Sequence, residues 1–188
     1  EPDTEVPFNP KLARSLLAEA GYEGGENFPL LEILFNTQEG HRKIAVALQE
    51  MWKDYLNIDI KLLNQEWKVY LATESAGDYQ ISRGGWIGDY VDPNNFLDMF
   101  LCGGGNNRTG WCNEEYDRLI LEVAPSQSSH EERLAVFQQA ETMLLDDMPI
   151  IPVYTYTSVK LVDSSVENLD GNIMNQAMYK DIYLSPRQ

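Results

Sequence analysis

Apolar positions in the first half of the chain recur with two periods, one close to 3.6 residues and one of two residues. The helical period predicts a helix that begins at Pro10, a second over about 41–56 and a third over 67–75. The intervening β-rich runs predict strands over 30–36, 58–63 and 79–83. Strand, helix and strand in this order predict a right-handed βαβ unit, and therefore an α/β fold with a mixed sheet flanked by helices.

Capping signals mark the helices of the second half. Asp92 followed by Pro93 predicts an N-cap and a first helical residue, Asn113 predicts another N-cap, and Ser129 with Glu132 predicts a capping box. Beyond these helices, residues 150–162 form a long β-rich run, and Ile182 to Leu184 predicts a last strand. The long run needs a partner that the remaining residues do not supply, so we expect a further piece of protein to cover it.

Composition narrows the class of protein. Of the 188 residues 43% are hydrophobic, and the formal net charge is −16. Nucleic-acid binding requires a basic patch, whereas the few Lys and Arg residues are scattered, so neither nucleic acid nor an anionic membrane is expected as a partner. Because no apolar run approaches the roughly 20 residues that span a bilayer, we expect no membrane insertion.

The two cysteines, Cys102 and Cys112, flank a Gly/Asn-rich stretch. Glycines allow the chain to turn back so that the two sulfurs meet, which favours a loop-closing disulfide and an oxidising compartment. Two free buried thiols are the alternative. A metal site is not expected, because the nearest histidine, His130, lies far along a helical pattern.

Signals for catalysis are weak, since the sequence contains neither a Gly-x-Ser-x-Gly elbow nor a phosphate-binding glycine loop. The densest candidate for function is the loop over 84–92, where Trp86 and Tyr90 offer flat amphipathic surfaces. Asp92 is explained as a helix cap, whereas Asp89 has no such explanation and is a candidate ligand contact. A hydrolase that pairs Asp89 with Asp92 is an alternative that requires a raised pKa at one carboxyl group.

Other candidates have ordinary structural explanations beside the functional one. Trp67 opens a helix after a strand and could be a core residue, and Arg83 ends a strand and could form a surface ion pair. Tyr154 and Tyr156 lie on one face of the late β-rich run, where ordinary sheet packing explains them equally well.

Five segments together resemble a known family in their order and spacing: Asn36-Thr37, His41 with Lys43, Asn64 to Lys68, Arg83 to Tyr90, and Pro149 to Tyr156. They resemble the periplasmic oligopeptide-binding proteins of ABC importers, a family that also contains dipeptide, murein-peptide and nickel receptors. The resemblance implies that residues 1–148 form the C-terminal ligand-binding lobe of a type II periplasmic binding protein. It also implies that residues 149–188 cross the hinge and pack on a first lobe.

The resemblance also implies roles for individual residues. Asp89 matches the aspartate that binds the α-ammonium group of the peptide, and Arg83 and His41 match residues that meet its carboxylate. The residues that match the lining of the ligand cavity are Trp67, Trp86 and Tyr156. Glu74 departs from the pattern, because enteric members carry an arginine there, and it favours a less acidic or more basic C-terminal region of the ligand.

We therefore expect a monomeric periplasmic receptor, without catalytic residues, cofactor or metal, that captures oligopeptides and delivers them to the permease subunits of an ABC transporter. Receptors for dipeptides, murein peptides, nickel or haem are alternatives within the binding class. Outside that class, a carboxylate-dependent hydrolase and a signalling or chaperone-like protein remain open.

Overall fold

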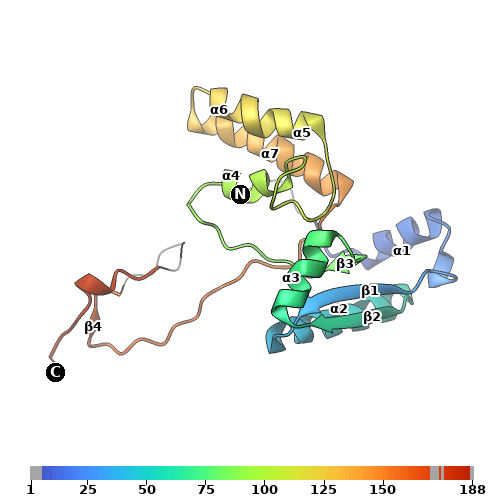
Figure 1. The fold of residues 1–188 in the computed structure, drawn as a ribbon, viewed down its shortest axis with the longest axis horizontal. Coiled ribbons are helices and arrows are strands. Elements are labelled where there is room, and N and C mark those ends of the chain that lie inside the picture. The colour runs from blue at the N-terminus through green and yellow to red at the C-terminus, as the bar shows by residue number, and fades with distance from the viewer. Residues whose placement is uncertain (1–5, 170–173, 175, 187–188) are drawn as a thin grey trace. The chain divides into compact units, whose positions relative to one another are not determined.

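The computed structural model describes residues 6–169, 174 and 176–186. The chain forms two compact units (Figure 1). Unit 1 contains Glu1–Gly85 and Cys102–Cys112, and unit 2 contains Trp86–Leu101 and Asn113–Gln188. Each unit is described by itself below.

Unit 1 is an α/β unit. Its elements are α1 (Pro10–Glu19), the 3-10 turn η1 (Glu23–Gly25), β1 (Leu31–Asn36), α2 (Glu39–Leu56), β2 (Ile60–Gln65), α3 (Trp67–Ala76) and β3 (Ile81–Ser82). The strands form one sheet in the order β2-β1-β3, and β1 pairs in parallel with both neighbours.

The predicted α/β architecture with flanking helices is confirmed, but this sheet is parallel, not mixed. Each pair of successive strands is connected by a helix, and such a crossover returns the chain in the same direction. Because the second crossover runs back over β1, right-handed connections place α2 and α3 on opposite faces of the sheet (Figure 1).

The centre of unit 1 is strand β1. Ile33, Leu34 and Phe35 are 2%, 1% and 2% exposed, and Asn36 at the end of the strand is also buried. An uninterrupted buried run, in place of an alternating one, is typical of a parallel strand with both faces covered by helices.

The second strand begins two residues later than predicted. Helix α2 ends at Asn57, which adopts a left-handed conformation with φ 56°, and the amide of Ile58 then donates to the carbonyl of Trp52. The amide of Asn57 itself donates to the carbonyl of Lys53, four residues back, which is the single bond of the αL cap motif. An apolar residue just past such a helix end commonly packs back on the last turn. Ile58 is therefore buried as part of the helix end, and the strand starts at Ile60.

Unit 2 is mainly helical in its first part. It contains α4 (Asn94–Leu97), η2 (Asp98–Phe100), α5 (Glu114–Arg118), the π-helical turn η3 (Leu119–Val123), α6 (Ala124–Ser126) and α7 (His130–Asp147). The caps at Asn113 and Ser129 are confirmed, the latter as a complete capping box with Glu132. The largest buried side chain is that of Tyr116, which is fully buried and donates a hydrogen bond of 2.7 Å to the carbonyl of Leu97.

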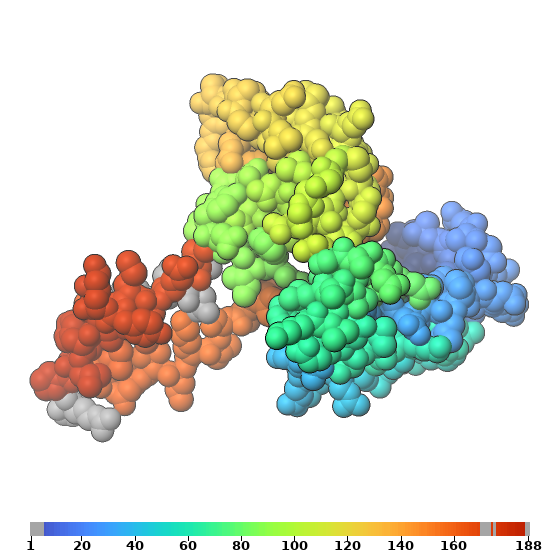
Figure 2. Space-filling view, in the orientation of Figure 1, coloured from blue at the N-terminus to red at the C-terminus, as the bar shows by residue number. Residues whose placement is uncertain are grey.

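The last part of unit 2 differs from the prediction. Residues 151–163 have no regular secondary structure and all are exposed, so the strand predicted over 150–162 is wrong for the structure of this chain (Figure 2). A strand requires partners for its backbone N–H and C=O groups. The predicted last strand is confirmed as β5 (Tyr183–Leu184), which follows η4 (Tyr179–Asp181) and pairs antiparallel with β4 (Val166–Glu167). In the part of the chain that the structure describes, no helix is both long and apolar enough to cross a membrane.

Candidate functional site

Three of the candidate residues share one edge of the sheet in unit 1. His41 lies in the first turn of α2 after β1, Trp67 is the first residue of α3 after β2, and Arg83 directly follows β3. Because the three strands are parallel, these positions all lie at the carboxyl ends of the strands. This edge is where ligands bind in open α/β sheets, and the helices that start there direct backbone N–H groups towards it.

His41 is held at this edge by two neighbours. Its backbone N–H donates to the side-chain oxygen of Gln38 at 2.8 Å, and its Nδ1 lies 2.8 Å from Oδ1 of the buried Asn36. Partial burial and, to a smaller extent, the cationic Arg83 lower the pKa of His41 from its ordinary value of 6.5. The ring is therefore neutral at pH 7, and Nδ1 donates its proton to Asn36.

The backbone of Arg83 is held by a hydrogen bond from Tyr70 of α3. The Tyr70 hydroxyl lies 2.9 Å from the carbonyl oxygen of Arg83 and 2.7 Å from Oε1 of Glu74. The hydroxyl of Ser82 also donates to Glu74, at 3.0 Å. Burial raises the pKa of Tyr70 to about 12, so that the phenol stays protonated. Trp67 stacks on Tyr70 with ring centroids 5.7 Å apart and remains 52% exposed, so it presents one face to solvent.

The predicted loop of unit 2 is organised by a residue that the sequence did not single out. Asn95 of α4 is 3% exposed, and its Oδ1 accepts hydrogen bonds from Nε1 of Trp86 at 2.8 Å and from the backbone N–H of Asp89 at 3.1 Å. The Asp89 side chain itself is exposed, and within its own unit its carboxylate makes no hydrogen bond or ion pair with described residues. The loop thus fixes the backbone of Asp89 while its carboxylate stays available to a ligand.

Asp92 has two structural roles. The predicted N-cap is one residue out, because α4 begins at Asn94 and its N-cap is Pro93, but Oδ1 of Asp92 still accepts from the backbone N–H of Asn94 at the start of the helix. The two oxygens of Asp92 also accept from the guanidinium of Arg133 at 2.7 and 2.8 Å. These bonds lower the pKa of Asp92. A general acid needs a raised pKa, so Asp92 does not suit that role in the paired-carboxylate hydrolase.

Tyr156 belongs to the last part of unit 2. It lies in the exposed segment 151–163, where its ring makes an edge contact with that of Tyr154 at 4.8 Å. The structure therefore groups His41, Trp67 and Arg83 in unit 1 and Trp86 with Asp89 in unit 2. Tyr156 remains a candidate from the sequence resemblance alone.

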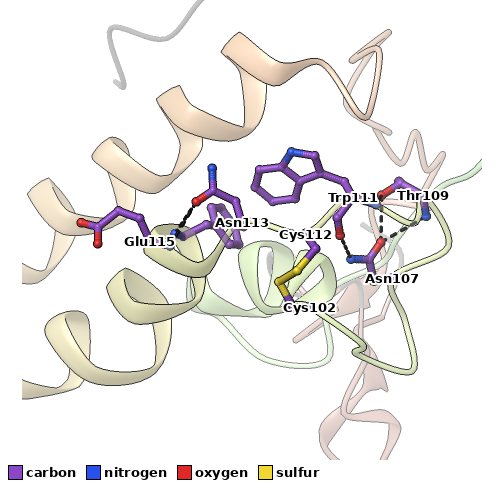
Figure 3. The surroundings of a disulfide bond; sticks show 8 residues. Cys102, Asn107, Thr109, Trp111, Cys112, Asn113 and Glu115 are labelled. Carbon is purple, nitrogen blue, oxygen red and sulfur yellow. Dashed lines mark hydrogen bonds between the residues drawn. A yellow bond between two sulfur atoms is a disulfide. The ribbon is translucent and has the colours of Figure 1, made fainter.

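The predicted disulfide between Cys102 and Cys112 is confirmed, with the two Cα atoms 4.6 Å apart (Figure 3). Inside the closed loop, Asn107 donates to the carbonyl of Trp111 at 2.9 Å and accepts from the hydroxyl of Thr109 at 2.8 Å. The hydroxyl of Tyr79 donates to the carbonyl of Arg108, which attaches the loop to unit 1. Among the described residues, no group of three or more His, Cys, Asp or Glu side chains is arranged to hold a metal ion.

Comparison with known proteins defines the class of this α/β fold as that of the solute-binding proteins. Residues 1–108 match the family described as bacterial extracellular solute-binding proteins, family 5 Middle. The chain therefore belongs to the family 5 extracellular solute-binding proteins, which bind solutes and are not enzymes.

Individual relatives and solved structures agree with this family. The oligopeptide-binding protein OppA of Bacillus subtilis is 40% identical over 173 residues, which are 92% of this chain and 31% of that protein. The unliganded open form of the periplasmic murein tripeptide binding protein MppA superposes with a TM-score of 0.82 at 32% identity, over 98% of this chain and 37% of that one. The Haemophilus influenzae OppA complex with the peptide RPPGFSPFR superposes with a TM-score of 0.79 at 35% identity, over 93% of this chain and 34% of that one. The chain spans about a third of the length of these proteins.

Proposed function

We propose that this chain forms the C-terminal part of the ligand-binding region of a receptor that captures oligopeptides outside the cytoplasm and delivers them to an ABC transporter. The observation that carries the proposal is the exposed Asp89 carboxylate on a loop whose backbone is fixed by the buried Asn95. Relatives named for binding oligopeptides, such as OppA of Bacillus subtilis, support the same ligand class.

Asp89 binds the α-ammonium group of the peptide in this proposal. A charge-assisted hydrogen bond in a site that closes on its ligand contributes about 1.5–3 kcal/mol. The carboxylate is suited to this role because it has no hydrogen-bond donor among the described residues of its unit. Trp86, whose indole N–H is already bonded to Asn95, offers its ring face to the peptide beside it.

Arg83 and His41 meet the peptide carboxylate, and Trp67 and Tyr156 line the cavity, in the same proposal. The carboxyl edge of the sheet supports the first assignment, because His41 and Arg83 both lie there and the charge of Arg83 acts on His41. Glu74 adds a negative charge next to the carbonyl of Arg83. We infer that it disfavours peptides with acidic residues near their C-terminus.

Residues 1–148 are proposed to act as a ligand-binding lobe, and residues 149–188 as a segment that packs on a first lobe. Exposed apolar side chains in the extended stretch, among them Ile151 and Val153 at 57% and 54%, support this proposal. The receptor is proposed to be a monomer in the periplasm of a Gram-negative envelope, where it docks on the permease subunits of its transporter. The disulfide, which persists in oxidising compartments, supports that location.

The test is calorimetric titration of mixed tri- to pentapeptides into the full-length receptor that contains this chain, as wild type and as Asp89→Asn. The variant keeps the size of the side chain and removes its charge. We expect an affinity loss of at least about tenfold, which corresponds to about 1.4 kcal/mol. N-terminal acetylation of the peptide removes the same charge pair from the other side, so acetylated peptides should bind both proteins equally weakly.

Asp78→Asn is the matched control, because Asp78 is also an exposed loop carboxylate but precedes β3, at the amino edge of the sheet. It should bind peptides as the wild type does. Binding that ignores Asp89→Asn would move the ammonium site elsewhere, and a full-length receptor that binds no peptide would refute the proposed function.

A further inference from the structure

We propose that Asn95 is a positioning residue for the ammonium site: its single side-chain oxygen sets the backbone of Asp89 and the indole of Trp86 at the same time. This inference rests on the proposed function of Asp89. In this proposal Asn95 itself does not contact the ligand. The residue acts through the loop that it holds.

The hydrogen bonds at Asn95 match what its amide oxygen can accept. A carbonyl-type oxygen has two lone pairs, and both are used here, one by Nε1 of Trp86 at 2.8 Å and one by the N–H of Asp89 at 3.1 Å. Asn95 is 3% exposed, so water does not replace either bond in the folded chain. Loss of the acceptor therefore leaves two donors without a partner and frees the loop between them.

Helix α4, which carries Asn95, is fixed at both ends although it has only one turn. At its start, Asp92 accepts from the N–H of Asn94 and is held in turn by Arg133 of α7. At its end, the carbonyl of Leu97 accepts from the hydroxyl of Tyr116 of α5. The acceptor that positions Asp89 is thus attached to both long helical segments of the same unit.

Close packing limits the other conformations of the loop. A Cβ added to Gly88 would lie 3.2 Å from the ring of Phe96 and 3.5 Å from Oδ1 of Asn95. The backbone at Gly88 therefore runs directly against α4. This close approach brings the next residue, Asp89, within reach of the Asn95 oxygen, and a side chain at position 88 would have to displace the Phe96 ring.

Three variants of Asn95 separate positioning from a merely structural role. Asn95→Leu and Asn95→Ala remove the acceptor, whereas Asn95→Asp keeps an acceptor of the same shape but buries a charge. Stability should therefore fall more in the aspartate variant than in the leucine variant. Peptide affinity should follow the opposite order, with a loss of at least about tenfold for leucine or alanine and of less than about threefold for aspartate.

Amide hydrogen exchange measures the positioning without any ligand. In the chain alone and in the full-length receptor, the Asp89 amide should exchange at least about tenfold faster in Asn95→Ala than in the wild type, and at the wild-type rate in Asn95→Asp. Asn113→Ala is the matched control, because it removes an asparagine cap from α5 of the same unit and should leave the Asp89 amide protected.

The two proposals fail in different ways. An Asp89 amide that exchanges equally in Asn95→Ala and in the wild type would overturn the positioning role, whatever Asp89→Asn does to binding. Affinity losses that simply follow the losses of stability across the three variants would also overturn it. If Asp89→Asn leaves affinity unchanged while the exchange result holds, the ammonium role of Asp89 fails and the structural link from Asn95 stands.

Discussion

The two groups of candidate residues are positioned by different means. At the sheet edge of unit 1, His41, Trp67 and Arg83 owe their places to regular elements, because each follows a strand of the parallel sheet. In the loop of unit 2, Trp86 and Asp89 lie outside any helix or strand. They are held by hydrogen bonds to the side-chain oxygen of Asn95, one from the indole of Trp86 and one from the backbone N–H of Asp89. The two tryptophans show the contrast directly, since Trp67 stacks on Tyr70 and is half exposed, whereas the N–H of Trp86 is hydrogen-bonded to Asn95.

This difference indicates where each group is sensitive to mutation. Residues at the sheet edge depend first on the burial of β1, so changes in the core should move them most. Residues in the loop depend on a few polar contacts, so single polar substitutions should move them while the core stays intact. The following predictions test that distinction, beginning with the largest expected effect.

Leu34→Ala should reduce the free energy of unfolding of unit 1 by about 3 kcal/mol, because it removes a side chain that is 1% exposed in the central strand and leaves a cavity. Urea denaturation followed by tryptophan fluorescence measures the loss. Leu12→Ala in α1 is the control, since Leu12 is 50% exposed, and it should change stability by less than about 0.5 kcal/mol. Equal losses for the two variants would contradict a sheet edge that depends on the core.

Replacement of both Cys102 and Cys112 by serine should lower the free energy of unfolding by about 2–3 kcal/mol, since the bridge restricts a short loop in the unfolded chain. Denaturation with and without a reducing agent checks this. The wild type under reducing conditions should match the double variant, which should itself be insensitive to the reductant. A double variant as stable as the oxidised wild type would show that the loop contacts through Tyr79 suffice.

Arg133→Met should cost about 2 kcal/mol of stability, because it leaves Asp92 without its two charge-assisted bonds and removes the guanidinium 4.4 Å above the Phe137 ring. Arg118→Met is the control. Arg118 makes an ion pair of 2.6 Å with Glu115, but the two side chains are 49% and 46% exposed, so its loss should reduce stability clearly less than the loss of Arg133. If the two variants are equally stable, the Asp92 pair does not support the loop.

Acid should weaken the Asp92 contribution to stability. Arg133 holds the folded pKa of Asp92 below its ordinary value of 3.8, so the folded state binds a proton there less readily than the unfolded state. The contribution is therefore complete above the ordinary pKa and is lost as pH falls through the folded pKa. The stability difference between wild type and Arg133→Met should stay constant above about pH 5 and shrink below pH 3.8. A difference that is constant down to pH 2 would refute the assignment.

Most of unit 1 could be predicted from the sequence, because its signals are local. The proline at the start of α1, the apolar stripe of α2 and the buried run of β1 each lie within a few residues of the element that they define. Ile58 misled the prediction for β2, since the same alternation of apolar residues serves both a helix end and a strand. The sheet was predicted as mixed, but it is parallel because a helix links each pair of successive strands.

The supports of the loop could not be predicted, because they depend on residues far apart in the chain. Asp92 pairs with Arg133 across 41 positions, and nothing near either residue indicates the partner. Asn95 carried only a weak signal, that of a polar residue on a helix of one turn, and its burial appears only in three dimensions. For residues 150–162 the sequence predicted too much structure. These residues have strand propensity, but propensity alone does not provide a neighbouring strand with which to pair.

The bond between His41 and Asn36 has a consequence for the energetics of ligand capture. Since Nδ1 of the neutral ring donates to Asn36, only Nε2 remains, and a neutral Nε2 offers a lone pair and not a proton. In the proposed receptor, a peptide carboxylate that docks on His41 therefore draws a proton from the solution onto Nε2. Capture of such peptides becomes proton-coupled, and its measured heat depends on the ionisation enthalpy of the buffer. Peptides whose carboxylate meets Arg83 alone in the proposed receptor bind without this exchange, so their measured heat should not depend on the buffer.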